Sequence, residues 1–259
     1  MAALNLIAPT SWGELSQEQL AFLLRTIETV NRANLGRRFR SAEDFSDQCS
    51  AQVATFCLFR WNGVAVVTPY SDAWLLAHDG EEFVVSAADI AAATRYLSWI
   101  SELPQEPVRL DCIDGAKAVP ADLDGDFSFD DWLACEALWQ NYQVSQASET
   151  LAQMAALLYK SETISPAPWQ LLGIFYWWAG VKALFNRLFP NFFQPSSGPA
   201  AEPNPDSVRR NMDAQIRALT KGDITKEELI LSMPALRALT ELDALAREYD
   251  ELNRKYPSK

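Results

Sequence analysis

The chain has 259 residues, 49% of them hydrophobic and 22% charged, so it can bury a sizeable core and is not disordered throughout. Its 34 acidic and 22 basic side chains give a net charge of -12, which argues against a nucleic-acid binder that works through phosphate contacts. The single histidine and the four cysteines without a CxxC pair match none of the common zinc-binding patterns.

The first residues and the cysteines favour a cytoplasmic protein. No basic segment followed by a cleavable apolar stretch is present, so no signal peptide is expected. The four cysteines are expected to be reduced and mostly buried. Residues 169–193 are the one candidate for a membrane span, but a span needs roughly 20 apolar residues, and Lys182 and Arg187 interrupt this segment. We therefore expect no membrane span.

The N-terminal half is predicted to hold a helix followed by strands. Ser16 and Gln19 form a capping box, and apolar residues repeat at helical spacing from Leu20 to Val30. Residues 53–61 and 64–68 are rich in β-branched and aromatic side chains, and the Asn-Gly pair between them predicts a hairpin. Further along are a hairpin with strands at 74–77 and 82–85, a helix that begins after Ser86 and runs to about residue 101, and a strand at 108–113.

From Ser128 onward the apolar spacing is helical. The sequence predicts a mostly α-helical α+β fold with a small antiparallel β-meander in the N-terminal half, a helical middle and tethered C-terminal helices. Helices are predicted at residues 129–142, 150–159, from 169, 207–219, 225–232 and 234–256. The predicted domains are a main body at 1–193 (β section 52–113, helices 128–193), a Pro-rich linker at 194–206 and a C-terminal helical module at 207–259.

Candidate catalytic and metal-binding groups are few. His78 lies in a His-Asp-Gly run that is typical of a turn, and neither a nucleophile elbow nor a phosphate-binding loop is present. Possible oxygen ligands alternate as in a calcium loop at Asp122, Asp124, Asp126, Ser128 and Asp130. However, Phe127 and Leu133 stand where that loop needs a glycine and a bidentate acid. We expect no catalytic residue, no metal and no cofactor. An enzyme that uses carboxylates, with or without a divalent cation, is the alternative.

The helix predicted from Trp169 is the most distinctive segment. Apolar residues surround it from Leu171 to Val181, so it is either a central core helix or a helix that docks a partner on its outer side. Gly173 and Gly180 lie seven residues apart on one face and leave a smooth strip that another backbone can approach. The residues predicted to bind a partner from this helix are Trp169, Gly173, Tyr176, Trp177, Gly180 and Leu184.

The helices after the linker have the same ambiguity. They are short to fold alone, so they dock on the main body, pair with another copy of the chain or bind a client protein. The last helix carries one apolar stripe that suits any of these roles. The residues of that stripe predicted to bind a partner are Leu236, Leu239, Leu242 and Tyr249.

Four stretches of sequence together resemble a known group of proteins. They are residues 9–20 (PTSWGELSQEQL), 57–63 (CLFRWNG), 182–193 (KALFNRLFPNFF), and 211–243 with its runs RALTKGDIT and RALTELD. These stretches resemble uncharacterised proteins encoded in phages and prophages of gut Bacteroidales, among the tail genes near the tape-measure gene.

The resemblance implies a role in tail assembly that needs apolar surfaces and no cofactor. We expect a non-enzymatic, chaperone-like assembly factor that binds the tape-measure protein or another tail protein, or associates with itself. The expected location is the bacterial cytoplasm or the virion, and no nucleic-acid partner is expected. A structural component of the tail or connector is the alternative.

Overall fold

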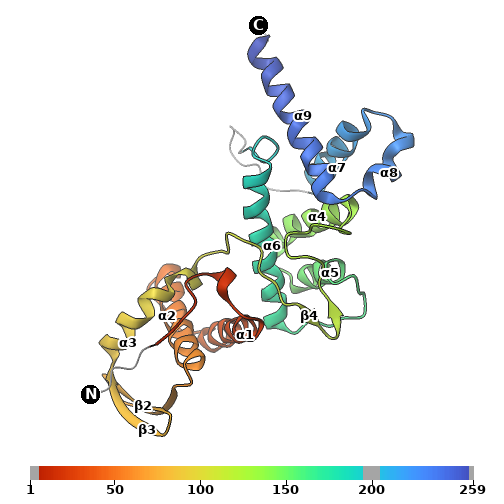
Figure 1. The fold of residues 1–259 in the computed structure, drawn as a ribbon. Coiled ribbons are helices and arrows are strands. Elements are labelled where there is room, and N and C mark those ends of the chain that lie inside the picture. The colour runs from red at the N-terminus through yellow and green to blue at the C-terminus, as the bar shows by residue number, and fades with distance from the viewer. Residues whose placement is uncertain (1–5, 195–204, 257–259) are drawn as a thin grey trace. The chain divides into compact units, whose positions relative to one another are not determined.

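The computed structural model describes residues 6–194 and 205–256 (Figure 1). The fold is α+β and mostly helical, with a small antiparallel sheet of three strands in the N-terminal half, which confirms the predicted fold class. Contacts divide the described chain into two compact units. The first unit contains residues 6–104 and 168–173, and the second contains residues 105–167 and those from 174 onward.

Two helices that pack against each other begin the first unit. Helix α1 (Gln17–Asn34) starts with the predicted capping box, in which Ser16 accepts a hydrogen bond from the Gln19 amide and Gln19 bonds back to the Ser16 amide. Helix α2 (Ala42–Trp61) starts at Ser41, whose side chain also accepts a backbone hydrogen bond in the first turn. Each helix turns an apolar face toward the other.

The strand predicted at residues 53–61 is wrong, because these residues form the second half of α2. The Asn-Gly pair that follows ends this helix instead of turning a hairpin. Gly63 takes a left-handed φ of 65°, as a residue after a helix C-terminus often does. The side chain of Asn62 accepts a hydrogen bond from the Ile7 amide at 2.8 Å and donates one to the Ile7 carbonyl at 2.9 Å, which holds the N-terminal segment against the end of α2.

Three antiparallel strands follow in sequential order: β1 (Ala65–Pro69), β2 (Ala73–His78) and β3 (Glu81–Ser86). The hairpin of β2 and β3 confirms the second predicted hairpin. Its two turn residues, Asp79 and Gly80, both have positive φ, as a tight two-residue turn between twisted strands requires. Because β3 pairs on one side only, it is an edge strand of this sheet.

A capped helix closes the first unit. Helix α3 (Ala87–Thr94) begins where predicted, with the Ser86 side chain accepting a hydrogen bond from the Asp89 amide at 3.1 Å. It continues into a 3-10 helix at Arg95–Ser101. Apolar side chains from α2, the sheet and α3 form a small core of their own, which contains Phe59, Val64, Leu76 and Ile90.

The second unit is helical apart from one short ladder. Only Cys112–Ile113 (β4) of the strand predicted at 108–113 is a strand, and it pairs with Ala116–Lys117 (β5). The helices predicted here are present, with ends shifted by a few residues. They are α4 (Phe129–Ser145), α5 (Ser148–Leu158), α6 (Pro168–Leu188), α7 (Pro205–Thr220), α8 (Glu227–Leu231) and α9 (Ala235–Lys255). Of α6, only the part from Ile174 onward belongs to this unit. The largest fully buried side chains of this unit are those of Phe127, Phe129, Trp132, Trp177, Trp178 and Phe185.

The C-terminal helices belong to this same unit, which differs from the predicted division into a body and a separate module. Helices α7, α8 and α9 contact α4. Two backbone hydrogen bonds join the start of α9 to the start of α4. The Phe129 amide donates to the Met233 carbonyl and the Ala235 amide donates to the Phe127 carbonyl, both at 2.8 Å. Residues 195–204 of the predicted linker lie outside the described residues.

Candidate protein-binding site

The middle of α6 is enclosed by the second unit. Trp177 and Trp178 are both 0% exposed. The Trp177 indole N–H donates to the Ala121 carbonyl at 2.7 Å, and the Trp178 indole N–H donates to a carboxylate oxygen of Glu136 at 3.2 Å. A buried indole needs such a partner, so both side chains are held in fixed orientations by their own chain. Trp177 is therefore part of the core.

The glycine strip of α6 is also occupied. A Cβ built at Gly180 would lie 2.4 Å from the Glu106 carbonyl oxygen and 2.9 Å from the Cα atom of Pro107. The close backbone approach predicted for this strip therefore exists, but the backbone belongs to this chain. Arg187, two turns farther along α6, donates to the Gln105 carbonyl at 2.8 Å and holds the same segment. Gly173 is buried as well.

The other three residues predicted on this helix are half-buried. Trp169 lies in the first unit, where the Arg25 guanidinium stacks 4.3 Å from the centre of its ring. Tyr176 packs edge-to-face on Phe175, with ring centres 5.4 Å apart, and burial raises the pKa of its phenol. Leu184 keeps a partly exposed side chain near the end of α6.

One ion pair joins α6 to α4. Lys182 Nζ lies 2.7 Å from Glu136 Oε2, and both side chains are about four-fifths covered. The ammonium also lies 4.8 Å from the ring centre of Phe193 and 5.5 Å from that of Trp132. The positive charge that interrupts the apolar run of α6 is therefore paired inside the unit, with a carboxylate that also accepts from an indole.

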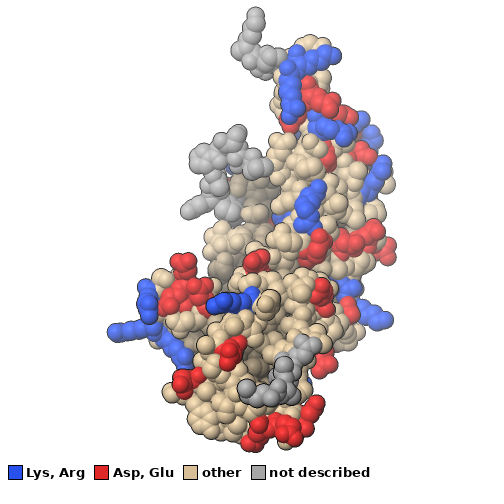
Figure 2. Space-filling model, turned by 60° about the vertical axis from the view of Figure 1, so that its left-hand side comes forward, with Lys and Arg blue, Asp and Glu red and all other residues tan. Residues whose placement is uncertain are grey.

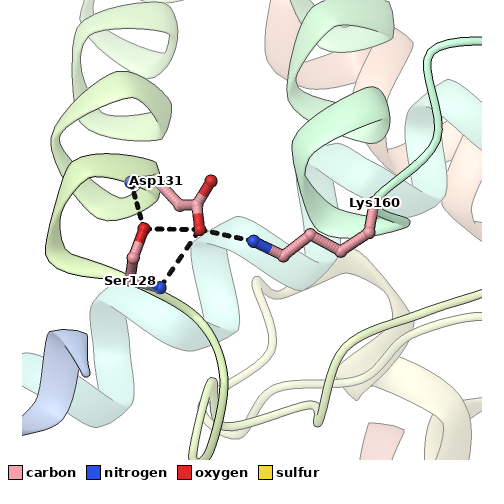
Figure 3. Close-up of polar contacts among 3 residues, drawn as sticks. All are labelled: Ser128, Asp131 and Lys160. Carbon is pink, nitrogen blue, oxygen red and sulfur yellow. Dashed lines mark hydrogen bonds and ion pairs between the residues drawn. The ribbon is translucent and has the colours of Figure 1, made fainter. Parts of the chain in front are cut away.

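The acidic segment before α4 caps the helix (Figure 3). The Ser128 hydroxyl donates to Asp131 at 2.6 Å and accepts from the Asp131 amide at 3.1 Å, and Lys160 pairs with the same carboxylate. Burial works against ionisation of Asp131, but the hydrogen bonds from Lys160 and Ser128 outweigh it and lower its pKa. Ser128 therefore caps α4, with Lys160 as an additional partner of Asp131.

The same segment gathers no set of metal ligands. Asp122, Asp124 and Asp126 are exposed, and Asp122 accepts a hydrogen bond from the Asp124 amide, as in an Asx turn. Within residues 6–194 and 205–256, no group of three or more His, Cys, Asp and Glu side chains is placed to hold a metal ion.

The cysteine thiols are free, and three of the four are buried. Burial raises the pKa of the Cys57 thiol to about 12 and raises that of Cys135 well above its ordinary value. The neighbouring carboxylates of Asp131 and Glu136 act in the same direction on Cys135. Such thiols are poor nucleophiles at neutral pH.

The apolar stripe predicted on α9 has a buried part and an exposed part. Leu239 and Leu242 are 0% and 4% exposed and pack inside the second unit, while Leu236 is half-buried. Tyr249, farther along the helix, is 66% exposed. Figure 1 shows this end of α9 extending beyond α7 and α8.

The exposed end of α9 carries apolar residues at heptad spacing. Leu245, Tyr249, Leu252 and Tyr256 alternate at intervals of four, three and four residues, and we call this set the α9 seam. Leu252 and Tyr256 are 58% and 67% exposed. Leu245, at the start of the seam, is half-buried. Of the four seam residues, only Tyr249 was among those predicted to bind a partner, although the heptad spacing was present to find the other three.

Asp243 anchors α9 just before the seam. Its carboxylate accepts hydrogen bonds from the Asn191 amide at 2.7 Å, the Phe192 amide at 3.0 Å and the Asn191 side chain at 2.8 Å. Burial opposes ionisation, but these bonds, together with the charge of Arg247, outweigh it and lower the pKa of Asp243. The turn that follows α6 is thereby bonded to α9.

Comparisons with protein-family models, with curated proteins and with solved structures find no match to this chain. Among the described helices, none combines the length and the apolar character that a membrane crossing demands.

Proposed function

We propose that the protein is a non-enzymatic binding and assembly factor that takes a helical partner along the α9 seam. The observation that carries this proposal is the exposure of Tyr249 and Leu252 on one face of α9, with exposed Tyr256 directly after the helix, while the preceding turns are anchored in the second unit. Aromatic and leucine side chains at heptad positions are what a second helix packs against.

Anchoring makes a short seam more useful than its length suggests. A free helix with two heptads would be ordered only on binding, and the lost conformational entropy would weaken the complex. Here Leu239, Leu242 and Asp243 already hold the first half of α9 in the unit. A partner helix therefore meets a helix whose first half is already held in place.

The resemblance to tail-region phage proteins supports one choice of partner. A tape-measure protein is a long helical chain that needs protection from aggregation, and we propose it as the client of the seam. The α6 surface expected to share this role is filled by the chain itself, so the proposal no longer uses Trp177 or Gly180.

The experiment that tests this function is co-expression and pull-down with a phage tape-measure protein. The paired change Tyr249→Gln and Leu252→Gln is expected to weaken capture at least tenfold, because it removes the exposed apolar contacts while keeping good helix formers. Arg254→Gln is the matched control, since it places the same side chain on another face of the same exposed turn.

Loss of capture by both variants, or by neither, would contradict a role of the seam. Failure of the natural chain to bind the tape-measure protein or to keep it soluble would overturn the chaperone role. Mass spectrometry of purified particles separates the two tail functions, since a chaperone is absent from them and a structural component is present at a fixed ratio. Sedimentation of the protein alone tests whether the seam binds a second copy.

A further inference from the structure

A hollow of about 730 Å³ opens in the first unit, between the β2–β3 hairpin, the end of α2 and helix α3. Its floor is apolar, and Phe59, Leu76 and Ile90 of the small core contribute to it. The other apolar side chains that line the hollow are Leu6, Leu58, Phe83, Val84, Val85 and Ala93. A half-open apolar hollow of this size is in the range of sites that bind small organic molecules.

The rim of the hollow is acidic. Asp79, Glu81, Glu82 and Asp89 line it, and none of its described lining residues is a lysine or an arginine. Glu81 and Glu82 are exposed, and within the described chain neither has an ion-pair partner. Figure 2 shows acidic side chains gathered at the lower end of the view, where Figure 1 places this hairpin.

The single histidine of the chain also lines the hollow. His78 ends β2, its side chain is 32% exposed, and its Nε2 atom lies 3.4 Å from a carboxylate oxygen of Asp79. Its Nδ1 atom is buried and has no hydrogen-bond partner among the described residues. A buried polar atom without a partner is costly, so the His78 ring keeps a hydrogen-bonding position that the described residues do not use.

We propose that this hollow binds an amphiphilic organic cation, with its apolar part on the floor and its ammonium group at the acidic rim to which Asp79, Glu81, Glu82 and Asp89 contribute. A neutral ligand would gain only the apolar contacts. An anionic ligand would be repelled by the rim. This site is in the first unit and does not depend on the α9 seam, so either proposal stands if the other fails.

The unique imidazole of His78 makes the test specific to this site. The probes are octylamine, octan-1-ol and octanoate, added at neutral pH to the full chain while the His78 ring signals are followed by NMR. Octylammonium is expected to shift these signals saturably and to bind about fivefold more tightly than octan-1-ol, because exposed ion pairs contribute modestly. Octanoate is expected to bind more weakly than either.

The charge and the volume of the site are tested by separate variants. The paired change Glu81→Gln and Glu82→Gln is expected to make octylammonium and octan-1-ol bind equally. Ala93→Phe fills the hollow and is expected to abolish the saturable shift, whereas Ala92→Phe, on the exposed neighbouring position outside the lining, is expected to leave it unchanged.

Absence of a saturable shift with all three probes would overturn the proposal, as would equal binding of octylammonium and octanoate. A change of the His78 signals on dilution of the protein alone would also overturn it, because it would show a second copy in the hollow. If Ala93→Phe fails to fold, the glutamine pair, which alters exposed side chains only, decides between these outcomes.

Discussion

Gly180 shows how one absent side chain shapes the second unit. A methyl group there would collide with the backbone of Glu106 and Pro107, which has no freedom to move as a side chain tip does. Gly180→Ala is expected to lower the free energy of unfolding by about 2 kcal/mol or more, as overpacking against fixed atoms does. Urea denaturation measures this change.

The control for this substitution is Gly13→Ala, because a Cβ at Gly13 meets nothing closer than 4.0 Å. It is expected to change the free energy of unfolding by less than about 0.5 kcal/mol. Equal stabilities of the two variants would show that the segment at Glu106 is not packed on α6 as described.

Asp131 couples stability to pH. Folding lowers its pKa from the ordinary value of 3.8. Its contribution to the free energy of unfolding is therefore complete above that ordinary value, and is lost as the pH falls through the pKa of the folded protein. Asp131→Asn is expected to cost about 1–2 kcal/mol at pH 7, and the difference from the natural protein is expected to shrink below pH 4.

Unfolding free energies of the two proteins, measured between pH 7 and pH 3, check this dependence. Asp130→Asn is the comparison, because Asp130 is exposed in the same helical turn and makes no bond to Ser128 or Lys160. A difference that stays constant down to pH 3 would contradict the assignment of the pH dependence to Asp131.

At the scale of elements, helix caps and periodic apolar stripes could be predicted from the sequence. Segments whose residues suit both a helix and a strand could not. Helices α1, α3 and α4 begin at the predicted Ser16, Ser86 and Ser128, because a cap is a local chemical arrangement. Helix α2 was missed because its second half is rich in strand-forming residues and ends in Asn-Gly, which serves equally as a hairpin turn and as a helix stop. The serine cap at Ser41 was the signal that favoured a helix.

The candidate site was predictable only in part for a different reason. An apolar surface all round α6 fits a core helix and a docking helix alike, and the choice depends on distant segments such as the one at Glu106. On α9 the stripe itself was predictable. Leu239 is buried and Tyr249 is exposed because the other helices of the unit cover only the first part of α9. The sequence around these two residues does not show where that cover ends.

The bond network of Asp243 is expected to decide how firmly α9 is held. Asp243→Ala leaves the Asn191 and Phe192 amides without their partner. The free energy of local opening of α9 is therefore expected to fall by about 1–3 kcal/mol. Hydrogen exchange of α9 amides measures this opening. Asp250→Ala, which removes only a bond to Gln194, is expected to change exchange little; equal effects would contradict the anchoring role.

At the scale of the whole molecule, the net charge of -12 opposes compactness. Raising the ionic strength shortens the range of this repulsion from about 14 Å at 0.05 M to about 4 Å at 0.5 M. The midpoint of thermal unfolding is therefore expected to rise with sodium chloride over this range. A falling midpoint would mean that attractive ion pairs such as Lys182–Glu136 outweigh the repulsion.

The distribution of the four thiols has a practical consequence. Cys112 is exposed in β4, whereas the other three are covered by packed side chains. A maleimide dye added to the native protein should therefore attach at one position without mutagenesis. A fluorophore placed there would report on the second unit alone, and would give binding experiments an optical signal that the nine tryptophans, spread through the chain, are too numerous to provide.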